Sequence, residues 1–584
     1  MAARPRSVEG AATCLALLAM LACNPRDRAT GEASPARTVS SAAATASVAP
    51  VVSLLEARLD NPAAYVPPQC YTQTRDADGT VHNPCFTCHT RAERPNFVDD
   101  EALQIHYDFR APARENRWMN LYVDRRADVA AVTDEEILRY VRTSNYRAGE
   151  RLLLAETLHP RQGGKLPEVW DVDHDGRWGG YVPDAHFDFD EHGFDRDPKG
   201  APTGWRAYAY YPFPGVFFPT NGSAGDVLLR LPAAFREGED GRYDPTVYRV
   251  NLALTEALIK RRDVAIEAVD EEALGVDLDQ DGKRGRATRV AFRPEAMRYV
   301  GRARLEQAAG KIALEPGLFP GGTELLHSVR YLDVVNGEVT MAARFKELRY
   351  ARKAAWVSSD KLAELAAAEA RELRDYPDRL ERMLGEPEHG LSNGQGWLYQ
   401  GFIEDRDGAL RPQTLEETTF CMGCHRGVGA TTDGVFSFRR KLDASAQAEG
   451  WFHWTQHGLR GLAEPQAADG RYEYTFYLEQ NGAGDDLRDN EEVIAKFFDG
   501  QALRPDVVAR LHGDIAELLL PSPQRALMLD ATYRSIVLAQ SFTRGRDATL
   551  TPAARVHRRV EPHQATGIIT PVAAPLAPRP AFTP

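Results

Sequence analysis

The sequence contains few cysteines, seven among 584 residues. Cys14 and Cys23 lie near the N-terminus, four others lie in two short motifs, and Cys70 remains. If the motif thiols are consumed by a cofactor, Cys70 has no partner left, which excludes a network of structural disulfides. Cys70 is then either a buried, unreactive residue or a thiolate that ligates a metal or reacts with a sulfur compound.

The chain also lacks long apolar runs, an excess of positive charge and long internal repeats. After residue 23, no segment is apolar enough to cross a bilayer. The formal net charge of −13 argues against a nucleic-acid partner. Such a charge suits a basic electron-transfer partner, and it is also typical of an ordinary solvated surface.

What the sequence does contain is a pair of CxxCH motifs, at Cys85-Phe86-Thr87-Cys88-His89 and Cys421-Met422-Gly423-Cys424-His425. With so few cysteines, chance predicts far less than one such motif in the chain. The two thiols of each motif can add to the two vinyl groups of one haem, and the adjacent imidazole then binds the iron. The alternative is a zinc site built from both CxxC pairs, which requires neither histidine.

These motifs resemble those of the c-type cytochromes, and the chain is identified as a dihaem member of that broad class. The resemblance implies two covalently bound haem c groups and electron transfer, with haem attachment outside the cytoplasm. It implies that His89 and His425 are the proximal iron ligands. Dihaem cytochrome c peroxidases also carry two such motifs, but in compact modules close together, whereas residues 90 to 420 separate the motifs here.

The N-terminus is typical of an exported lipoprotein. Arg4 and Arg6 precede an apolar run over residues 11–22, which has the length of a signal-peptide core. Small residues before Cys23 predict lipidation of this cysteine, and an ordinary signal peptide cut nearby is the alternative. Asn24 replaces the Asp that retains many lipoproteins at the inner membrane. We therefore expect a periplasmic, membrane-anchored protein, with the outer membrane favoured.

Composition and periodicity predict a mixed α+β multidomain protein. Mainly helical, cytochrome c-like haem regions at both ends would flank a mixed α/β centre. The expected boundaries are a signal peptide at 1–23, a flexible tether at 24–50, the first haem region at 51–160, the central region with Asp-rich loops at 161–390, the second haem region at 391–565 and a disordered tail at 566–584.

Several local elements are predicted from their own signals. Thr133 and Glu136 form a capping box, and Asn336-Gly337 predicts a hairpin turn. Helices are expected over residues 51–59, 247–260 and 361–384, the last interrupted at Pro377, and strands are expected over residues 264–269, 287–292, 329–334 and 339–343.

The second axial ligand of each haem is open. His106 and Met119 follow the first motif at plausible distances, and His453 and His457 follow the second. On a helix, two histidines four residues apart share one face. His327 and the basic run over residues 346–353 are weaker indications of a site. The basic run could face haem propionates or an anionic substrate, and a solvated face is its preferred interpretation.

Two loops match the first half of a calcium-binding loop. Neither has the bidentate Glu at position 12, so more distant oxygens would have to complete a site, and turns without metal are the alternative. The candidate ligands are Asp171, Asp173 and Asp175 in the first loop and Asp277, Asp279 and Asp281 in the second.

Three functions agree with these features. The first is electron transfer between periplasmic or outer-membrane redox partners through two haems. The second is a haem-dependent oxidoreductase with an open distal site, peroxidase-like or acting on a small sulfur or nitrogen compound. The third is a ligand-binding lipoprotein with an attached redox module.

Overall fold

The structure is a computed structural model, and it describes residues 52–572 except 56–57, 76–78, 92–93, 97–99, 161–163, 216–218, 443–450, 455, 468 and 482–489. The predicted signal peptide, the predicted lipidation site Cys23 and the predicted tether lie outside the described residues. Residues Val51–Pro584 group together as one unit. Among the described residues, no helix has both the length and the apolar character that a bilayer span requires.

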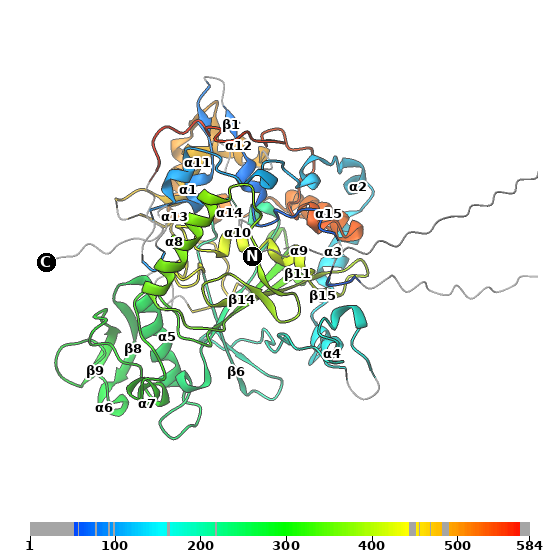
Figure 1. The fold of residues 1–584 in the computed structure, drawn as a ribbon. Coiled ribbons are helices and arrows are strands. Elements are labelled where there is room, and N and C mark those ends of the chain that lie inside the picture. The colour runs from blue at the N-terminus through cyan, green and yellow to red at the C-terminus, as the bar shows by residue number, and fades with distance from the viewer. Residues whose placement is uncertain are drawn as a thin grey trace, which may run out of the picture. The chain divides into compact units, whose positions relative to one another are not determined.

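A nine-stranded antiparallel sheet forms the centre of this unit (Figure 1). The strand order is β12, β13, β14, β11, β10, β7, β6, β5, and β15 pairs with β14. The strands are β5 (Phe194–Arg196), β6 (Pro202–Tyr208), β7 (Val227–Arg230), β10 (Glu324–Val335), β11 (Glu338–Lys353), β12 (Leu384–Glu386), β13 (Gly390–Ser392), β14 (Trp397–Glu404) and β15 (Leu410–Pro412).

Four two-stranded ribbons and fifteen labelled α-helices surround the sheet in the described part of the chain. The ribbons are β1 (Thr74–Arg75) with β2 (Val81–His82), β3 (Arg147–Ala148) with β4 (Arg151–Leu152), β8 (Val264–Asp270) with β9 (Arg286–Val290), and β16 (Phe498–Asp499) with β17 (Ala502–Leu503). The helices are α1 (Cys85–Cys88), α2 (Arg126–Ala130), α3 (Asp134–Arg142), α4 (Leu153–Leu158), α5 (Pro245–Lys260), α6 (Glu271–Leu274), α7 (Arg302–Ala308), α8 (Ser359–Asp375), α9 (Leu415–Thr419), α10 (Met422–His425), α11 (Glu473–Asn481), α12 (Glu491–Phe497), α13 (Pro505–Gly513), α14 (Ala516–Leu519) and α15 (Pro523–Ala539).

The two longest strands, β10 and β11, form the hairpin that Asn336-Gly337 predicts. Both turn residues have positive φ, 53° and 82°, as a type I′ turn requires. Pairing continues from this turn as far as Glu324 opposite Arg352. The hairpin therefore extends well beyond the predicted strands and becomes the middle of the sheet.

Side chains on successive residues of a strand point to opposite faces of the sheet. On one face, Leu326, Tyr350 and Phe402 pack against the segment that contains Trp178. On the other face, Ala351 and Tyr399 belong to a cluster that includes α5 and reaches the second CxxCH motif at Met422. We call this second side of the sheet the motif face.

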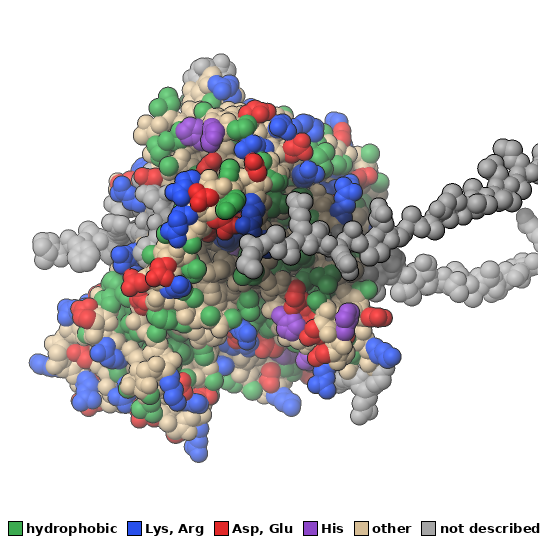
Figure 2. Space-filling model, in the orientation of Figure 1, with side chains coloured by type: hydrophobic (Ala, Val, Ile, Leu, Met, Phe, Trp, Pro, Cys, Tyr) green, Lys and Arg blue, Asp and Glu red, His purple; other side chains and the backbone are tan. Residues whose placement is uncertain are grey.

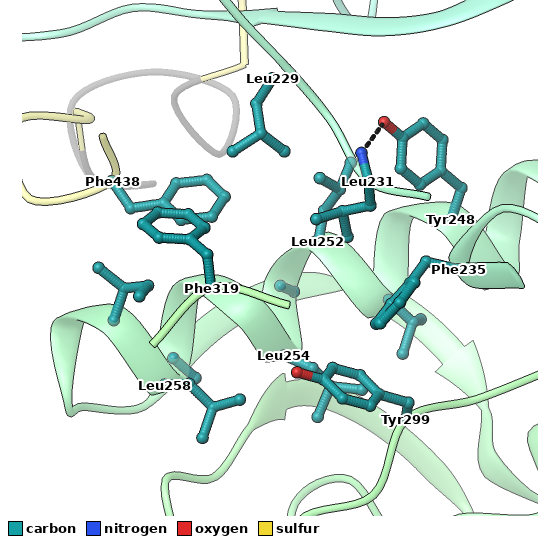
Figure 3. Packing of buried hydrophobic residues seen from close by; sticks show 14 of the residues in the cluster. Leu229, Leu231, Phe235, Tyr248, Leu252, Leu254, Leu258, Tyr299, Phe319 and Phe438 are labelled. Atoms are coloured by element: carbon teal, nitrogen blue, oxygen red, sulfur yellow. Dashed lines mark hydrogen bonds between the residues drawn. The ribbon is translucent and has the colours of Figure 1, made fainter. Parts of the chain in front are cut away.

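Helix α5 confirms the helix predicted over residues 247–260. Its first turn is capped by the carboxylate of Asp244, which accepts hydrogen bonds from Thr246 and Val247, and Pro245 occupies the first helical position. Figure 3 shows Leu254 and Leu258 of α5 within the cluster, and the stacked rings of Phe319 and Phe438 lie 5.8 Å apart beside them.

Other local predictions meet mixed outcomes. The capping box of Thr133 and Glu136 begins α3, as predicted. Helix α8 ends at Asp375, so the interruption predicted at Pro377 is confirmed, but the helix does not resume as predicted, and β12 begins at Leu384. The helix predicted over residues 51–59 is wrong, because the described residues of this segment form bends and irregular structure.

The predicted fold class is wrong in its mainly helical, cytochrome c-like haem regions. The α-helices of residues 51–160 have only four to nine residues each. Phe86 of the first motif packs against the C-terminal helices, and the second motif packs against the sheet. The physical reason is that apolar side chains of each motif pack into hydrophobic cores formed by segments distant in the sequence. Neither motif is therefore surrounded by a separate helical domain, and the central sheet with its surrounding helices forms the core of the unit.

The predicted tail begins with ordered contacts. Thr566 is buried, and the backbone of Val572 exchanges two hydrogen bonds with the side chain of Gln104. Residues 573–584 lie outside the described residues. On the surface seen in Figure 2, acidic and basic side chains are interspersed and do not form a large patch of one sign.

Candidate functional site

Each CxxCH motif forms a single helical turn. In α1 the amide of His89 donates to the carbonyl of Cys85 at 2.8 Å, and at α10 the amide of His425 donates to the carbonyl of Cys421 at 3.2 Å. Because residues three apart on a helix are neighbours, the two thiols of each motif lie on one side of its turn. This is the arrangement in which two thiols can hold one planar group.

Both motif histidines are oriented through Nδ1. His89 Nδ1 lies 3.0 Å from the carboxylate of Asp100, and His425 Nδ1 lies 2.9 Å from the carbonyl oxygen of Gly434. An acceptor at Nδ1 places the proton there and leaves Nε2 as the atom that binds a metal. Burial lowers the pKa of His425 to about 4, so its imidazole is neutral at physiological pH.

The first motif contacts the loop that directly follows the second motif, although the two motifs are far apart in the sequence. The amide of Ala430 donates to the carbonyl of Cys88 at 3.0 Å. The Asp100 oxygen that faces His89 also accepts a hydrogen bond of 2.9 Å from the amide of Gly429, across a sequence separation of 329 residues. A Cβ on Gly429 would lie 2.2 Å from the carbonyl oxygen of Thr90, so this approach requires glycine.

Five cysteines gather around this contact. Each is half-buried, yet burial raises the pKa of Cys70, of Cys421, of Cys424 and of Cys88, the last to about 11. The pKa of Cys70 is raised further by Cys85, Cys88 and Cys424, so thiols of both motifs surround it.

The loop after the second motif is fixed to the motif face. Lys353 and Asp433 form an ion pair whose side chains are completely buried. The hydroxyl of Tyr399 donates to the carbonyl of Gly434 at 3.3 Å, and the amide side chain of Asn393 donates to the carbonyl of His425 at 2.9 Å. The Tyr399 ring also lies 4.9 Å from the imidazole of His425. The sheet thus sets the position of this histidine.

The basic run over residues 346–353 is not a solvated face. Lys346 and Lys353 are buried. Arg349 pairs with Glu347 at 2.9 Å, and Arg546 pairs with the same carboxylate at 2.8 Å. Burial alone would raise the pKa of Glu347, but the two guanidinium groups lower it to about 2. Arg349 and Arg546 also act on the pKa of Cys421, so this charge network borders the second motif.

The candidate axial ligands from the sequence lie in different surroundings. His106 and Met119 are exposed. The His453 ring lies 4.7 Å from Phe189, and the His457 ring lies 5.1 Å from Phe452. The role of these four residues as iron ligands stays a prediction.

The first Asp-rich loop is completed by a residue from the sheet region. Asp171, Asp173 and the fully buried Glu388 bring their carboxylate oxygens within 4.8 Å of one another. Glu388 also accepts hydrogen bonds of 2.7 Å from the amides of Val172 and Gly179. Glu388 supplies the carboxylate that position 12 of the loop lacks.

The second loop repeats this arrangement. Glu271, Asp277 and Asp279 converge in the same way, and Glu271 is buried. Glu271 accepts hydrogen bonds from the amides of Leu278 at 2.6 Å and Gly285 at 2.9 Å, the same loop positions that bind Glu388 in the first loop. Oδ1 of Asp277 is buried and has no hydrogen-bond partner.

The third aspartate of each loop has another role. Asp175 accepts a hydrogen bond from the amide of Arg177 at 2.8 Å, and Asp281 accepts one from Lys283 at 2.7 Å. These carboxylates stabilise the turn that follows and do not join the converging groups of the described residues. As metal ligands they stay a prediction.

The sequence analysis missed the residues that organise both kinds of site. Asp100 and Gly434 orient the motif histidines, and no pattern near the motifs marks them. Glu271 and Glu388 complete the loops from outside, and Glu388 is far from its loop in the sequence. A zinc site built from the CxxC pairs finds no support in the described residues, because the converging ligand groups there contain no cysteine.

Comparison with known proteins identifies lipoproteins. A family model described as a "-like lipoprotein" matches residues 54–508. An "Uncharacterized lipoprotein" of Aquifex aeolicus (strain VF5) is 30% identical over 545 residues, which cover 85% of this chain and 87% of that relative. No solved structure matches the chain.

These matches correct the identification made from the two motifs. The family that matches is one of lipoproteins and not one of c-type cytochromes. Identification as a member of the c-type cytochrome class is therefore wrong. That identification used only two five-residue motifs, whereas the match to the lipoprotein family extends over most of the chain. The CxxCH residues themselves remain, and their chemistry must be argued from their geometry.

Replacing Asp100 with alanine should destabilise the protein, because it removes the hydrogen bonds to both His89 and Gly429. Each hydrogen bond to a charged group contributes about 1.5–3 kcal/mol, and we expect the free energy of unfolding to fall by about 2–4 kcal/mol. Urea denaturation measures this change. The control is Asp108→Ala at a nearby exposed carboxylate, with an expected change within about 0.5 kcal/mol. Equal effects would contradict the bridging role of Asp100.

Proposed function

The chain belongs to this family of lipoproteins, and we propose that it is a lipid-anchored electron-transfer protein that holds two covalently attached haems beside each other. The observation that carries this proposal is the contact between the first CxxCH turn and the loop that follows the second, made by Ala430 with Cys88 and by Asp100 with His89 and Gly429. The fold brings together two motifs that are more than 300 residues apart in the sequence. This arrangement supports a function that needs both motifs.

The residues of each motif fit a haem. The thiols of Cys85 and Cys88, and those of Cys421 and Cys424, lie on one side of a helical turn and are partly exposed. His89 and His425 have Nδ1 bound to an acceptor and Nε2 available for iron. Bound haem supplies one-electron redox chemistry, and its potential depends on burial and on the hydrogen bonds of its ligands.

The chain's own residues would perform three tasks. The four cysteines would form thioether bonds by adding S–H across vinyl groups, which needs no oxidant. Asp100 and Gly434 would fix the tautomers of the two imidazoles. The packed segments around the motifs would exclude water from both groups. One electron at a time would then be accepted from a reduced partner protein and passed to an oxidised one.

Membership in a lipoprotein family makes the protein exported and membrane-anchored. We propose that the lipid is attached at Cys23 and that the folded unit lies in the periplasm, with the outer membrane favoured because Asn24 follows the lipidated residue. Periplasmic cytochromes or similar redox proteins would be its partners. The net charge of −13 favours partners with a basic docking surface.

We propose further that the two Asp-rich loops bind calcium. Each combines two loop carboxylates with a buried glutamate from outside the loop. Carboxylate oxygens at this spacing suit a hard cation of flexible coordination. The buried, unpartnered Oδ1 of Asp277 favours the second loop in particular. Calcium there would stabilise loop geometry and would carry no redox chemistry.

Covalent haem content tests the main proposal. Wild-type protein produced with a haem-attachment system should carry two haems per chain, measured by mass spectrometry under denaturing conditions and by the pyridine haemochrome spectrum. Replacing both cysteines of one motif, by Cys85→Ser with Cys88→Ser or by Cys421→Ser with Cys424→Ser, should leave one haem, because thioether bonds need these thiols.

The matched control is Cys70→Ser, since Cys70 lies among the same thiols but outside both motifs. This variant should retain two haems. Wild-type protein that carries no covalent haem, or motif variants that retain both, would contradict the proposal.

Calcium should raise the melting temperature of protein first treated with a chelator. At a calcium concentration of 100 times Kd, binding to one site stabilises the folded state by about 2.7 kcal/mol. The variants Asp279→Ala and Asp173→Ala should each lose part of the shift in differential scanning fluorimetry. Asp240→Ala, at an exposed carboxylate in an ordinary turn, should keep all of it. A shift that survives in the double variant Asp173→Ala/Asp279→Ala would refute both sites.

A further inference from the structure

His327 lies on the motif face of the sheet. On β10 it pairs with Arg349 of β11 on one side and with Val227 of β7 on the other. Leu325 lies two residues before His327 on β10, and it pairs with Ala351 of β11. Ala351 in turn pairs with Tyr399 of β14. Residues that are two apart on a strand, and residues paired across strands, share a face. His327 and Tyr399 therefore project to the same side.

That side carries the second motif. Tyr399 contacts the imidazole of His425 with ring centres 4.9 Å apart, and Ala351 and Tyr399 belong to the same apolar cluster as Met422 and Cys421. Neighbouring strands are about 4.8 Å apart, so β10 and β14, with β11 between them, are separated by about 10 Å. His327 therefore projects from β10 toward the side of the sheet on which His425 lies over Tyr399 of β14.

The surroundings of His327 suit a metal ligand. The ring of Tyr210 lies 6.0 Å away and nearly perpendicular, which restricts the orientation of the imidazole. Burial, followed by the charge of Arg349, lowers the pKa of His327 to about 3, so its imidazole is neutral, as metal binding requires.

Arg349 connects the two histidines. It faces His327 across the β10–β11 pair, and after burial its charge lowers the pKa of His425 as well. By contrast, His106 is exposed, and the rings of His453 and His457 pack on Phe189 and Phe452. Of the histidines discussed, His327 is the one that shares a face of the sheet with the second motif.

We propose that His327 is the second axial ligand of the haem attached at Cys421 and Cys424, opposite His425. This inference rests on the proposed function. The step is the formation of a coordinate bond from an imidazole nitrogen to iron, with no electron transfer and no covalent bond broken. It would make the second haem a six-coordinate electron carrier and close that iron to exogenous ligands.

The test is the spin state of full-length protein loaded with haem. In His327→Ala, we expect one of the two haems to change from low-spin to high-spin in the ferric absorption and electron paramagnetic resonance spectra. Carbon monoxide should then bind one additional haem per chain after reduction. Added imidazole should restore the low-spin signal. Covalent haem content should stay at two per chain, which separates loss of the ligand from loss of the cofactor.

The control variant His159→Ala, at an exposed histidine that is not a candidate ligand, should leave the spectrum unchanged. If His327→Ala does not fold, His327→Met provides a second test: a thioether ligand should keep the haem low-spin and raise the midpoint potential of one haem, because Met/His ligation raises the potential. Two low-spin haems in His327→Ala, or unchanged potentials in His327→Met, would overturn the inference while leaving the proposed function intact. Wild-type protein without covalent haem would overturn both.

Discussion

The structure depends on the contact between the first CxxCH turn and the loop that follows the second, two segments that are far apart in the sequence. The Asp100 carboxylate accepts hydrogen bonds from both sides of this contact, and Gly429 allows the backbones to approach because any Cβ there would meet Thr90. Distant segments complete each other around it. Phe86 extends from the first turn into the C-terminal helices, while Tyr65 and Pro67 of the N-terminal region lie against Gly423 of the second turn. This interlocking is why residues 51–584 form one unit.

The central sheet gives the second turn its fixed position. Lys353, Asp433, Tyr399 and Asn393 attach the loop over residues 425–434 to the motif face through a buried ion pair and hydrogen bonds. Charges this deep in a protein are stable only when they are paired. A large sheet is more than two haem groups need for attachment, but it is a suitable platform for holding one ligand on a strand and the other on a loop above it. The size of the central region is explained if it positions the site and does not merely connect its halves.

Features of the sequence predicted those parts of the structure that depend on neighbouring residues. The Asn336-Gly337 turn, the Thr133 cap and the α5 helix each follow from a few adjacent side chains. The fold class failed because the pairing of β10 and β11 with β7 and β14 is set by contacts between distant segments, and the motifs alone suggested a helical environment. The same limit applies to the site. The CxxCH residues are visible in the sequence, whereas Asp100, Glu388 and the placement of His327 beside the second motif depend on tertiary structure.

Electron exchange between the two haems tests the central claim most directly. Protein that has been reduced by one electron per chain can be followed by time-resolved absorption after rapid photoreduction, at several protein concentrations. If the two motifs hold their haems in contact, the electron will redistribute within each molecule at a rate that does not depend on protein concentration. A rate that rises in proportion to concentration would show that electrons move between molecules, and it would contradict the account that the fold exists to bring the two sites together.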